Sequence, residues 1–198
     1  MILTKVYYLL RMTEKYKTHP EGLYFVTLTV VGGIDVFTRY EYCDLLIENL
    51  NYCIEHRRLR VYEYAILPSR LCMIAGVGEG KGNLPKVLRD LKSFSAKQIL
   101  RAIAEHPEES RKEWLLRLFQ FFANRYQHDS DHHFWQFGNQ PIDLEKIVKK
   151  EQDLPSALKS LLGDKIVDSP EHYIYCSAYP HQKVKLCEVG HPAAGNEN

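Results

Sequence analysis

The sequence predicts an α+β fold with an antiparallel β-sheet, and three observations support this fold class. A segment that alternates between two side-chain faces opens the domain at residues 24–31. Two further strand-like segments, 62–67 and 71–75, are separated by a short turn, and such a hairpin requires antiparallel pairing. Segments with helical spacing, 41–57 and 84–105, follow the first strand and the hairpin. The order strand, helix, hairpin, helix, strand, helix therefore favours a ferredoxin-like sheet covered by α-helices.

The first strand and the first helix are predicted from their side-chain periods. β-branched and aromatic residues dominate 24–31, where one face carries Tyr24, Val26, Leu28 and Val30. The helix at 41–57 spaces its apolar residues by three and four, at Leu46, Leu50, Cys53 and Ile54. Each element thus offers one apolar face to a shared core.

The helix at 84–105 has a clear start and two contrasting faces. Asn83 and Pro85 are favourable residues at a helix N-terminus. One side gathers the apolar residues Leu84, Val87, Leu88, Leu91, Phe94 and Ala102. Within roughly 120° on the other side lie four basic residues, diluted by Asp90, namely Lys86, Arg89, Lys97 and Arg101. A solvated charged face and a nucleic-acid surface both fit this pattern.

The later elements are shorter. The segment 113–127 predicts an amphipathic helix with an apolar row that we expect in the core, Trp114, Leu118, Phe122 and Tyr126. A polar loop then leads to a short strand at 134–137. Two helical pieces follow, separated near Pro155, and Gly163 suits a C-terminal cap.

Composition indicates one cytoplasmic domain. The 198 residues are 45% hydrophobic, which suits one domain at 14–182, preceded by an N-terminal extension at 1–13 and followed by a disordered tail at 183–198. Met12 is an alternative start to Met1, and the apolar run near the N-terminus is too short for a signal or a membrane span. The 26 basic and 25 acidic residues nearly balance, so nucleic-acid binding would need a local patch. Five cysteines without a C-x-x-C pair favour a reducing compartment, the cytoplasm.

Two segments are compared with known motifs, a phosphate-binding loop and a metal site in a polar loop. "AGVGEGKG" misses the phosphate-binding loop pattern, because Ala75 and Gly82 stand where Gly and Ser or Thr are needed. Imidazole and carboxylate side chains in a polar loop are able to bind a metal, and this loop has His128, Asp129, Asp131, His132 and His133. An ordinary polar loop is the favoured interpretation.

Five blocks occur in a fixed order along the chain: "YFVTLTVVGGIDVFTR", "YEYAILPSRLCMIAG", "LPKVLRDLKSFSAKQILRAI", "FWQFGNQPIDL" and "IVDSPEHYIYCSA". Together they resemble the insertion-sequence-200-like single-tyrosine HUH transposases, particularly the REP-associated tyrosine transposases, over roughly residues 14–178. In that family a hairpin P-N-H-x-H binds Mg²⁺ or Mn²⁺ through its two histidines. A tyrosine on a later helix attacks a DNA phosphate and becomes covalently linked to it. Histidines at i and i+2 of a strand share one face, as two ligands of one ion must.

This chain departs from the family at both halves of that site. Aligned on Pro68, the histidine positions hold Arg70 and Cys72. Arg offers a metal no lone pair, and a lone thiolate is a soft ligand unsuited to Mg²⁺ or Mn²⁺. The nucleophile position falls on Ser156, whose hydroxyl is shorter than a phenol and has no adjacent base evident in the sequence. We therefore expect no metal cofactor and no intact catalytic residue.

The resemblance favours a DNA-binding protein of transposase descent that has lost its nuclease and strand-transfer activity. The expected DNA contacts are Arg70, Lys86, Arg89, Lys92, Lys97 and Arg101, because Lys and Arg supply most sequence-independent affinity. The expected partners are single-stranded or hairpin DNA and a second copy in a homodimer, without membrane contact. Two alternatives stay open: an active transposase whose site has shifted to Tyr173, Tyr175 or the His132/His133 pair, and a non-catalytic relic that serves a protein partner.

Overall fold

The computed structural model describes residues 18, 22–78, 83–126, 130–138, 141–148, 156–163 and 165–187. The predicted N-terminal extension at 1–13 and the last eleven residues of the predicted tail, 188–198, lie outside this part of the chain. The described elements are β1 (Tyr24–Thr29), the 3₁₀ turn η1 (Val31–Gly33), α2 (Tyr40–Arg57), β2 (Leu59–Leu67), β3 (Arg70–Val77), α3 (Leu84–Glu105), α4 (Lys112–Arg125), β4 (Ile142–Asp143), α5 (Leu144–Val148), α6 (Ala157–Gly163) and the 3₁₀ turn η2 (Pro170–His172).

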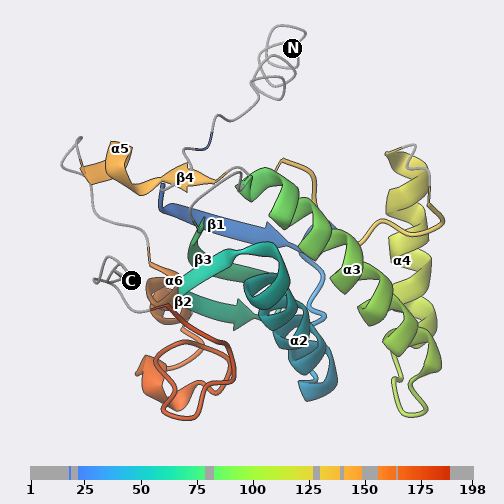
Figure 1. Ribbon diagram of the computed structural model, residues 1–198. Coiled ribbons are helices and arrows are strands. Elements are labelled where there is room, and N and C mark those ends of the chain that lie inside the picture. Colours follow the sequence, from blue (N-terminus) through green and yellow to red (C-terminus); the bar gives the residue numbers. More distant parts are fainter. Residues whose placement is uncertain are drawn as a thin grey trace, which may run out of the picture.

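A four-stranded sheet in the order β2-β3-β1-β4 forms the centre of the fold (Figure 1). Each neighbouring pair is antiparallel. The hairpin β2–β3 lies beside β1. Leu71 of β3 pairs with Leu28 of β1 on one side and with Ile66 of β2 on the other. Because α2 connects β1 to β2 and α3 follows β3, the order and pairing are those of a ferredoxin-like sheet. The predicted fold class is confirmed.

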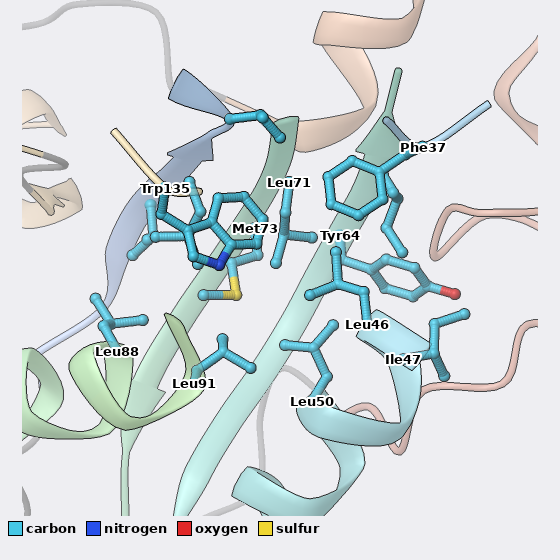
Figure 2. Close-up of a cluster of buried hydrophobic side chains, with 14 of the residues drawn as sticks. Phe37, Leu46, Ile47, Leu50, Tyr64, Leu71, Met73, Leu88, Leu91 and Trp135 are labelled. Carbon is cyan, nitrogen blue, oxygen red and sulfur yellow. The ribbon is translucent and has the colours of Figure 1, made fainter. Parts of the chain in front are cut away.

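The first face of the sheet, covered by α2 and α3, carries the main core. Strand alternation turns Tyr24, Val26 and Leu28 of β1 toward this face, and each is nearly fully buried. In Figure 2, Leu46, Ile47 and Leu50 of α2 and Leu88 and Leu91 of α3 point toward Leu71, Met73 and Tyr64 on the strands. Trp135 closes the top of this cluster, stacked on Phe37 with ring centroids 5.8 Å apart.

The second face of the sheet carries a smaller core. Here Ala65, Leu67 and Cys72 pack against Ala157 and Leu161 of α6. A β-bulge at Tyr62, between Val61 and Glu63, changes the alternation of β2, so that Leu59 and Val61 share the first face with Tyr64 and Ile66. Glu63 follows the bulge and lies on the second face with Ala65 by ordinary alternation.

Two helices bury their predicted rows only in part. The fully buried residues of α4 are Leu115, Phe119 and Ala123. Of the predicted row, Leu118 and Phe122 pack partly buried against the core, whereas Trp114 is 54% exposed and Tyr126 is 44% exposed. In α3, Phe94 is 42% exposed because it lies at the edge of the buried face, beside α2. The other predicted apolar positions of α3 face the core, with Ala102 partly buried.

The chain ends also differ from expectation. Residues 134–137 form a single bridge, Val30 to Trp135, and the fourth strand is β4 instead. The segment 175–177 pairs along the outer edge of β2, with Ile66 N donating to Tyr175 O at 2.9 Å. The first five residues of the predicted disordered tail continue this packing, since Val184 is buried and Cys187 N donates to Val61 O at 2.7 Å. The packed domain therefore extends to Cys187.

Candidate functional site

The hairpin turn is fixed against the end of β1. The carbonyl of Ser69 accepts from Val30 N at 2.8 Å, and the carbonyl of Pro68 accepts from Phe37 N at 2.8 Å. Pro has no N–H to donate, so its carbonyl is the group that a turn of this sequence presents. The first residue after the turn, Arg70, lies between Leu67 and Thr29 in the sheet register. Its position is therefore set by backbone pairing on both sides.

The positions that hold histidines in the resembled family lie on the second face of the sheet. Cys72 faces this side and is only 2% exposed, packed among Ala65, Ala157 and Leu161. Arg70, two residues earlier on the strand, shares this face and is half-buried. Thr27 Oγ1 lies 3.9 Å from the Cys72 sulfur.

These surroundings do not fit Mg²⁺ or Mn²⁺. The two ions take hard oxygen or imidazole ligands, whereas Cys72 contributes a thiol within an apolar cluster and Arg70 contributes a cation. Within the described ranges, no three side chains of the types His, Cys, Asp or Glu gather as metal ligands would. Two residues of the polar-loop hypothesis, His128 and Asp129, lie outside those ranges.

Ser156 lies at the start of α6 on the same face of the sheet. Its Oγ donates to Glu63 Oε1 at 2.5 Å and accepts from Leu158 N at 3.2 Å and Lys159 N at 3.4 Å. The next residue, Ala157, packs in one cluster with Cys72. The structure therefore brings the Ser156 end of α6 over the face that carries Arg70 and Cys72.

Glu63 is a residue of this region that sequence reasoning missed. We expected no base beside Ser156, but the Glu63 carboxylate accepts its hydroxyl and also accepts from Leu158 N at 3.2 Å. The two residues are 93 positions apart, and Glu63 lies on this face because it is two residues from Ala65 on the strand. The arrangement satisfies free N–H groups at a helix start, as an N-terminal cap does. It ties α6 to β2.

The tyrosines of the shifted-site alternative are engaged in packing. Tyr173 Oη donates to Ile66 O at 2.6 Å, and burial raises the pKa of Tyr173 to about 12. Burial also raises the pKa of Tyr175, whose hydroxyl lies 3.3 Å from Asp44 Oδ1. A phenol with a raised pKa is a weaker nucleophile at neutral pH. Of the two histidines, His133 is buried and stacks on Phe137 with centroids 4.2 Å apart, and His132 is half-buried.

Four basic residues of α3 face solvent, and we call them the α3 basic row: Lys86, Arg89, Lys97 and Arg101. The row contains local ion pairs, Arg101 with Glu105 at 2.8 Å and Arg89 with Asp90 at 3.6 Å. Both arginine side chains are highly exposed, so these ion pairs are weak and leave the arginines able to contact another partner.

Lys92 and Arg70 are separate from this row. Lys92 Nζ donates to Gln136 O at 2.8 Å, and burial lowers the pKa of its ammonium to about 8. Arg70 lies on the second face of the sheet, whereas α3 covers the first. The expected DNA-contact residues are thus divided over three places.

A small aromatic cavity adjoins the α3 basic row. It has a volume of about 290 Å³ and lies between α2 and α3, lined by Glu48, Asn49, Tyr52, Phe94 and Gln98. The rings of Tyr52 and Phe94 meet edge to face with centroids 6.4 Å apart. At its base, Asn49 Nδ2 donates to Gln98 Oε1 at 2.6 Å. Lys97 and Arg101 follow Phe94 along the same side of α3 by helical spacing.

Comparison with known proteins finds a similar solved structure but no matching family model. No family model matches the sequence, and no curated protein matches it either. Among solved structures, the chain is similar to a REP-associated tyrosine transposase bound to a REP hairpin, at 16% identity and a TM-score of 0.35. That similarity covers 71% of this chain and 88% of the other. What the sheet order and pairing define is an α+β domain of ferredoxin-like topology.

No described helix combines the length and the apolar character that crossing a membrane requires.

Proposed function

We propose that this protein is a transposase-like DNA-binding protein of the cytoplasm that holds single-stranded or hairpin DNA without cleaving it. The observation that carries this proposal is the α3 basic row, four exposed cations along one helix of a chain whose net charge is only +1. Phosphate contacts by Lys and Arg need no base sequence and supply much of the affinity of such proteins.

The adjoining aromatic cavity favours unpaired DNA over a duplex. Single-stranded nucleic acids bind where cations contact the backbone and aromatic rings stack on bases. Phe94 and Tyr52 are 42% and 46% exposed at this cavity, and bases that are paired and stacked inside a duplex are not free to stack on such rings. The unpaired part of a hairpin or an unstructured strand is therefore the proposed ligand of this surface.

The proposed loss of nuclease and strand-transfer activity rests on the second face of the sheet. A metal-dependent phosphoryl transfer needs metal ligands and an activated nucleophile. Cys72 lies in an apolar cluster beneath α6, and the Ser156 hydroxyl is used in capping that helix. Neither group is available for the two catalytic roles that the resembled family requires.

Salt-dependent binding tests the DNA proposal. Labelled hairpin DNA and an unstructured single strand are titrated by fluorescence anisotropy across a salt series. We expect an affinity in the micromolar range that falls steeply with salt, because each phosphate contact to a single strand adds about 0.7 to the slope of log affinity against log salt. The triple variant Arg89→Ala, Lys97→Ala, Arg101→Ala should bind more weakly and lose about 2 from that slope.

The matched control removes three charges elsewhere: Lys112→Ala, Lys146→Ala, Lys165→Ala. These residues lie on α4, on α5 and after α6. If the control weakens binding as much as the α3 variant, net charge decides the affinity and the α3 basic row is an ordinary solvated face. If the parent and the α3 variant bind DNA equally well, the α3 basic row is likewise an ordinary solvated face.

A second candidate function is that of a non-catalytic protein-interaction domain. The observation that favours it is an exposed apolar surface on α4, where Trp114 is 54% and Phe121 is 53% exposed. This surface is separate from the α3 basic row, so the two functions are not exclusive. If the protein shows no salt-dependent DNA binding, the protein-interaction domain is the remaining candidate function.

A further inference from the structure

The outward face of α4 carries two large, mostly exposed side chains, and a leucine between them packs only partly on the core. Trp114 and Phe121 are more than half exposed, Leu118 is partly buried, and Arg125 is exposed. Their spacing is four, three and four residues, the a and d spacing of a coiled-coil seam. We call Trp114, Leu118, Phe121 and Arg125 the α4 seam. An exposed apolar row of this size on a helix indicates a binding surface.

The rest of α4 is already occupied by packing within the chain. Leu115, Phe119 and Ala123 are buried against the core. Beside them, Phe122 lies against the backbone of η1, because a Cβ on Gly32 would stand 2.7 Å from its Cζ. In Figure 1, α4 stands at the edge of the molecule with α3 on one side. Among the described residues, the α4 seam is thus an apolar row that the core covers only in part, at Leu118.

We propose that the α4 seam binds the α4 seam of a second copy of this chain, with the two helices antiparallel. In a two-fold arrangement centred between Leu118 and Phe121, each Leu118 faces Phe121 of the other copy. Trp114 then faces Arg125 of the other copy, a pair that attracts through a cation–π interaction. The centre of the surface is apolar, and its two ends carry Trp114 and Arg125. The surface is therefore complementary to a second copy of itself, as a two-fold interface must be.

Charge selects the antiparallel arrangement. A parallel pair would place Arg125 opposite Arg125 and Glu113 near Glu113, which is unfavourable at both ends. The antiparallel pair instead brings Glu113 near Arg125 of the other copy. Within each helix Glu113 also pairs with Arg117 at 3.5 Å, and both side chains are about 80% exposed and free to turn.

The size of the surface sets the expected strength. With 14 residues, α4 is about 21 Å long, so a pair of such helices buries less area than standard stable interfaces do. Exposed rings at its C-terminal end, Tyr126 and Phe137, adjoin the seam and add area. We therefore expect a weak dimer whose dissociation constant lies in the micromolar range, on the order of 1 μM.

Sedimentation equilibrium of the full chain over a concentration series measures this association. The parent is expected to shift from monomer to dimer. Phe121→Glu places a charge at the centre of the interface and should weaken association by about tenfold or more, as replacing a central aromatic anchor does. The matched control is Ile174→Glu, an apolar residue that is 40% exposed away from α4, and it should associate like the parent.

A residue swap tests the orientation. Trp114→Arg alone places two arginines opposite each other and should weaken association, whereas Trp114→Arg combined with Arg125→Trp restores the pair and the dimer. In a parallel pair the swap would only move the repulsion, so failure of the rescue overturns the antiparallel arrangement. A parent that stays monomeric throughout overturns the proposal. So does a Phe121→Glu variant that loses single-stranded DNA binding while its association is unchanged, since the seam would then be a nucleic-acid surface.

Discussion

Glu109 shows how one buried charge fixes the ends of two helices. Its side chain is fully buried and accepts from Arg39 Nε at 2.9 Å and from Arg111 Nε at 3.1 Å. Tyr42 Oη adds a third hydrogen bond at 3.2 Å. Arg39 precedes α2 and Arg111 precedes α4, so the carboxylate links the starts of these helices. A buried charge is tolerated only when it is paired in this way.

Glu109 makes the stability of the fold sensitive to acid. Burial alone would raise the pKa of this carboxyl, but hydrogen bonds from Arg111 outweigh burial and lower the pKa to about 2. Because the pKa in the folded protein lies below the usual glutamate value of 4.5, the stabilisation is fully present above the unfolded pKa. It is lost as the pH falls through the folded value. Urea denaturation at a series of pH values should show the free energy of unfolding falling between about pH 5 and pH 2.

The variant Glu109→Gln identifies the residue responsible. It should lower the free energy of unfolding at neutral pH by about 3 kcal/mol, the lower end for a broken buried pair, because its arginine partners keep some contact with water. It should also flatten the acid dependence. The matched control Glu108→Gln changes a neighbouring exposed carboxyl, and an equal effect there would contradict this account.

At the scale of elements, α6 is held to the sheet by hydrogen bonds to Glu63 of β2. Glu63 accepts from the Ser156 hydroxyl and from Leu158 N, while Ala157 and Leu161 pack on the strands beneath. A seven-residue helix has little stability of its own, so its place depends on such contacts.

Removing the cap should loosen α6. Ser156→Ala is expected to lower the free energy of unfolding by about 1 kcal/mol, the usual value of a helix N-terminal cap. Glu63→Ala should have a similar effect, and the double variant should cost less than the sum because both side chains belong to one network. Thermal and urea denaturation measure these changes. Ser93→Ala, at an exposed position of α3, is the control, and strict additivity at Ser156 and Glu63 would show that the bond contributes nothing.

The elements also show which features a sequence pattern can predict. β1, α2, the hairpin and α3 were predictable because their alternation or helical spacing agrees with the face that is buried. In α4 the helix was predictable but its buried face was not. Two apolar rows lie side by side there, and the core buries Leu115 and Phe119 whereas Trp114 stays exposed. Periodicity identifies an apolar row without saying whether its partner is the same chain.

The candidate site had the same limit. Placing Arg70 and Cys72 on one strand face followed from the period of two, since adjacent residues alternate. Alternation also places Glu63 on that face, two residues from Ala65, but nothing in the sequence indicates that Ser156, 93 positions away, lies against it. Lys92 looked like one more cation on a helix, yet a loop carbonyl at Gln136 binds its ammonium. Contacts between distant segments decide such cases.

At the scale of the whole molecule, the two faces of the sheet separate binding from chemistry. The α3 basic row lies on a helix that covers the first face, whereas Arg70, Cys72 and Ser156 lie on the second. Under the proposed function, DNA held along α3 would therefore not contact Arg70, Cys72 or Ser156. A loss of cleavage at the second face would then leave the proposed binding surface unchanged.

The last prediction is that the unmodified chain forms no metal-dependent covalent link to DNA. Labelled single-stranded hairpin DNA is incubated with Mn²⁺ and the protein and analysed on a denaturing gel, beside a single-tyrosine HUH transposase that has the histidine pair and the tyrosine. We expect an adduct only with that transposase. One repair should not suffice, because restored histidines lack a nucleophile and a restored tyrosine lacks a polarised phosphate.

The full repair Arg70→His, Cys72→His, Ser156→Tyr has the best chance of cleavage, and the structure names its obstacles. A histidine at position 72 must fit a site that is 2% exposed, and a tyrosine at 156 gives up the cap of α6. Its folding is therefore measured beside its activity. An adduct with the unmodified protein, mapped to Tyr173 or Tyr175, would contradict the loss of activity. Such a link would require Tyr173 to leave Ile66, because its hydroxyl is otherwise bound to that carbonyl.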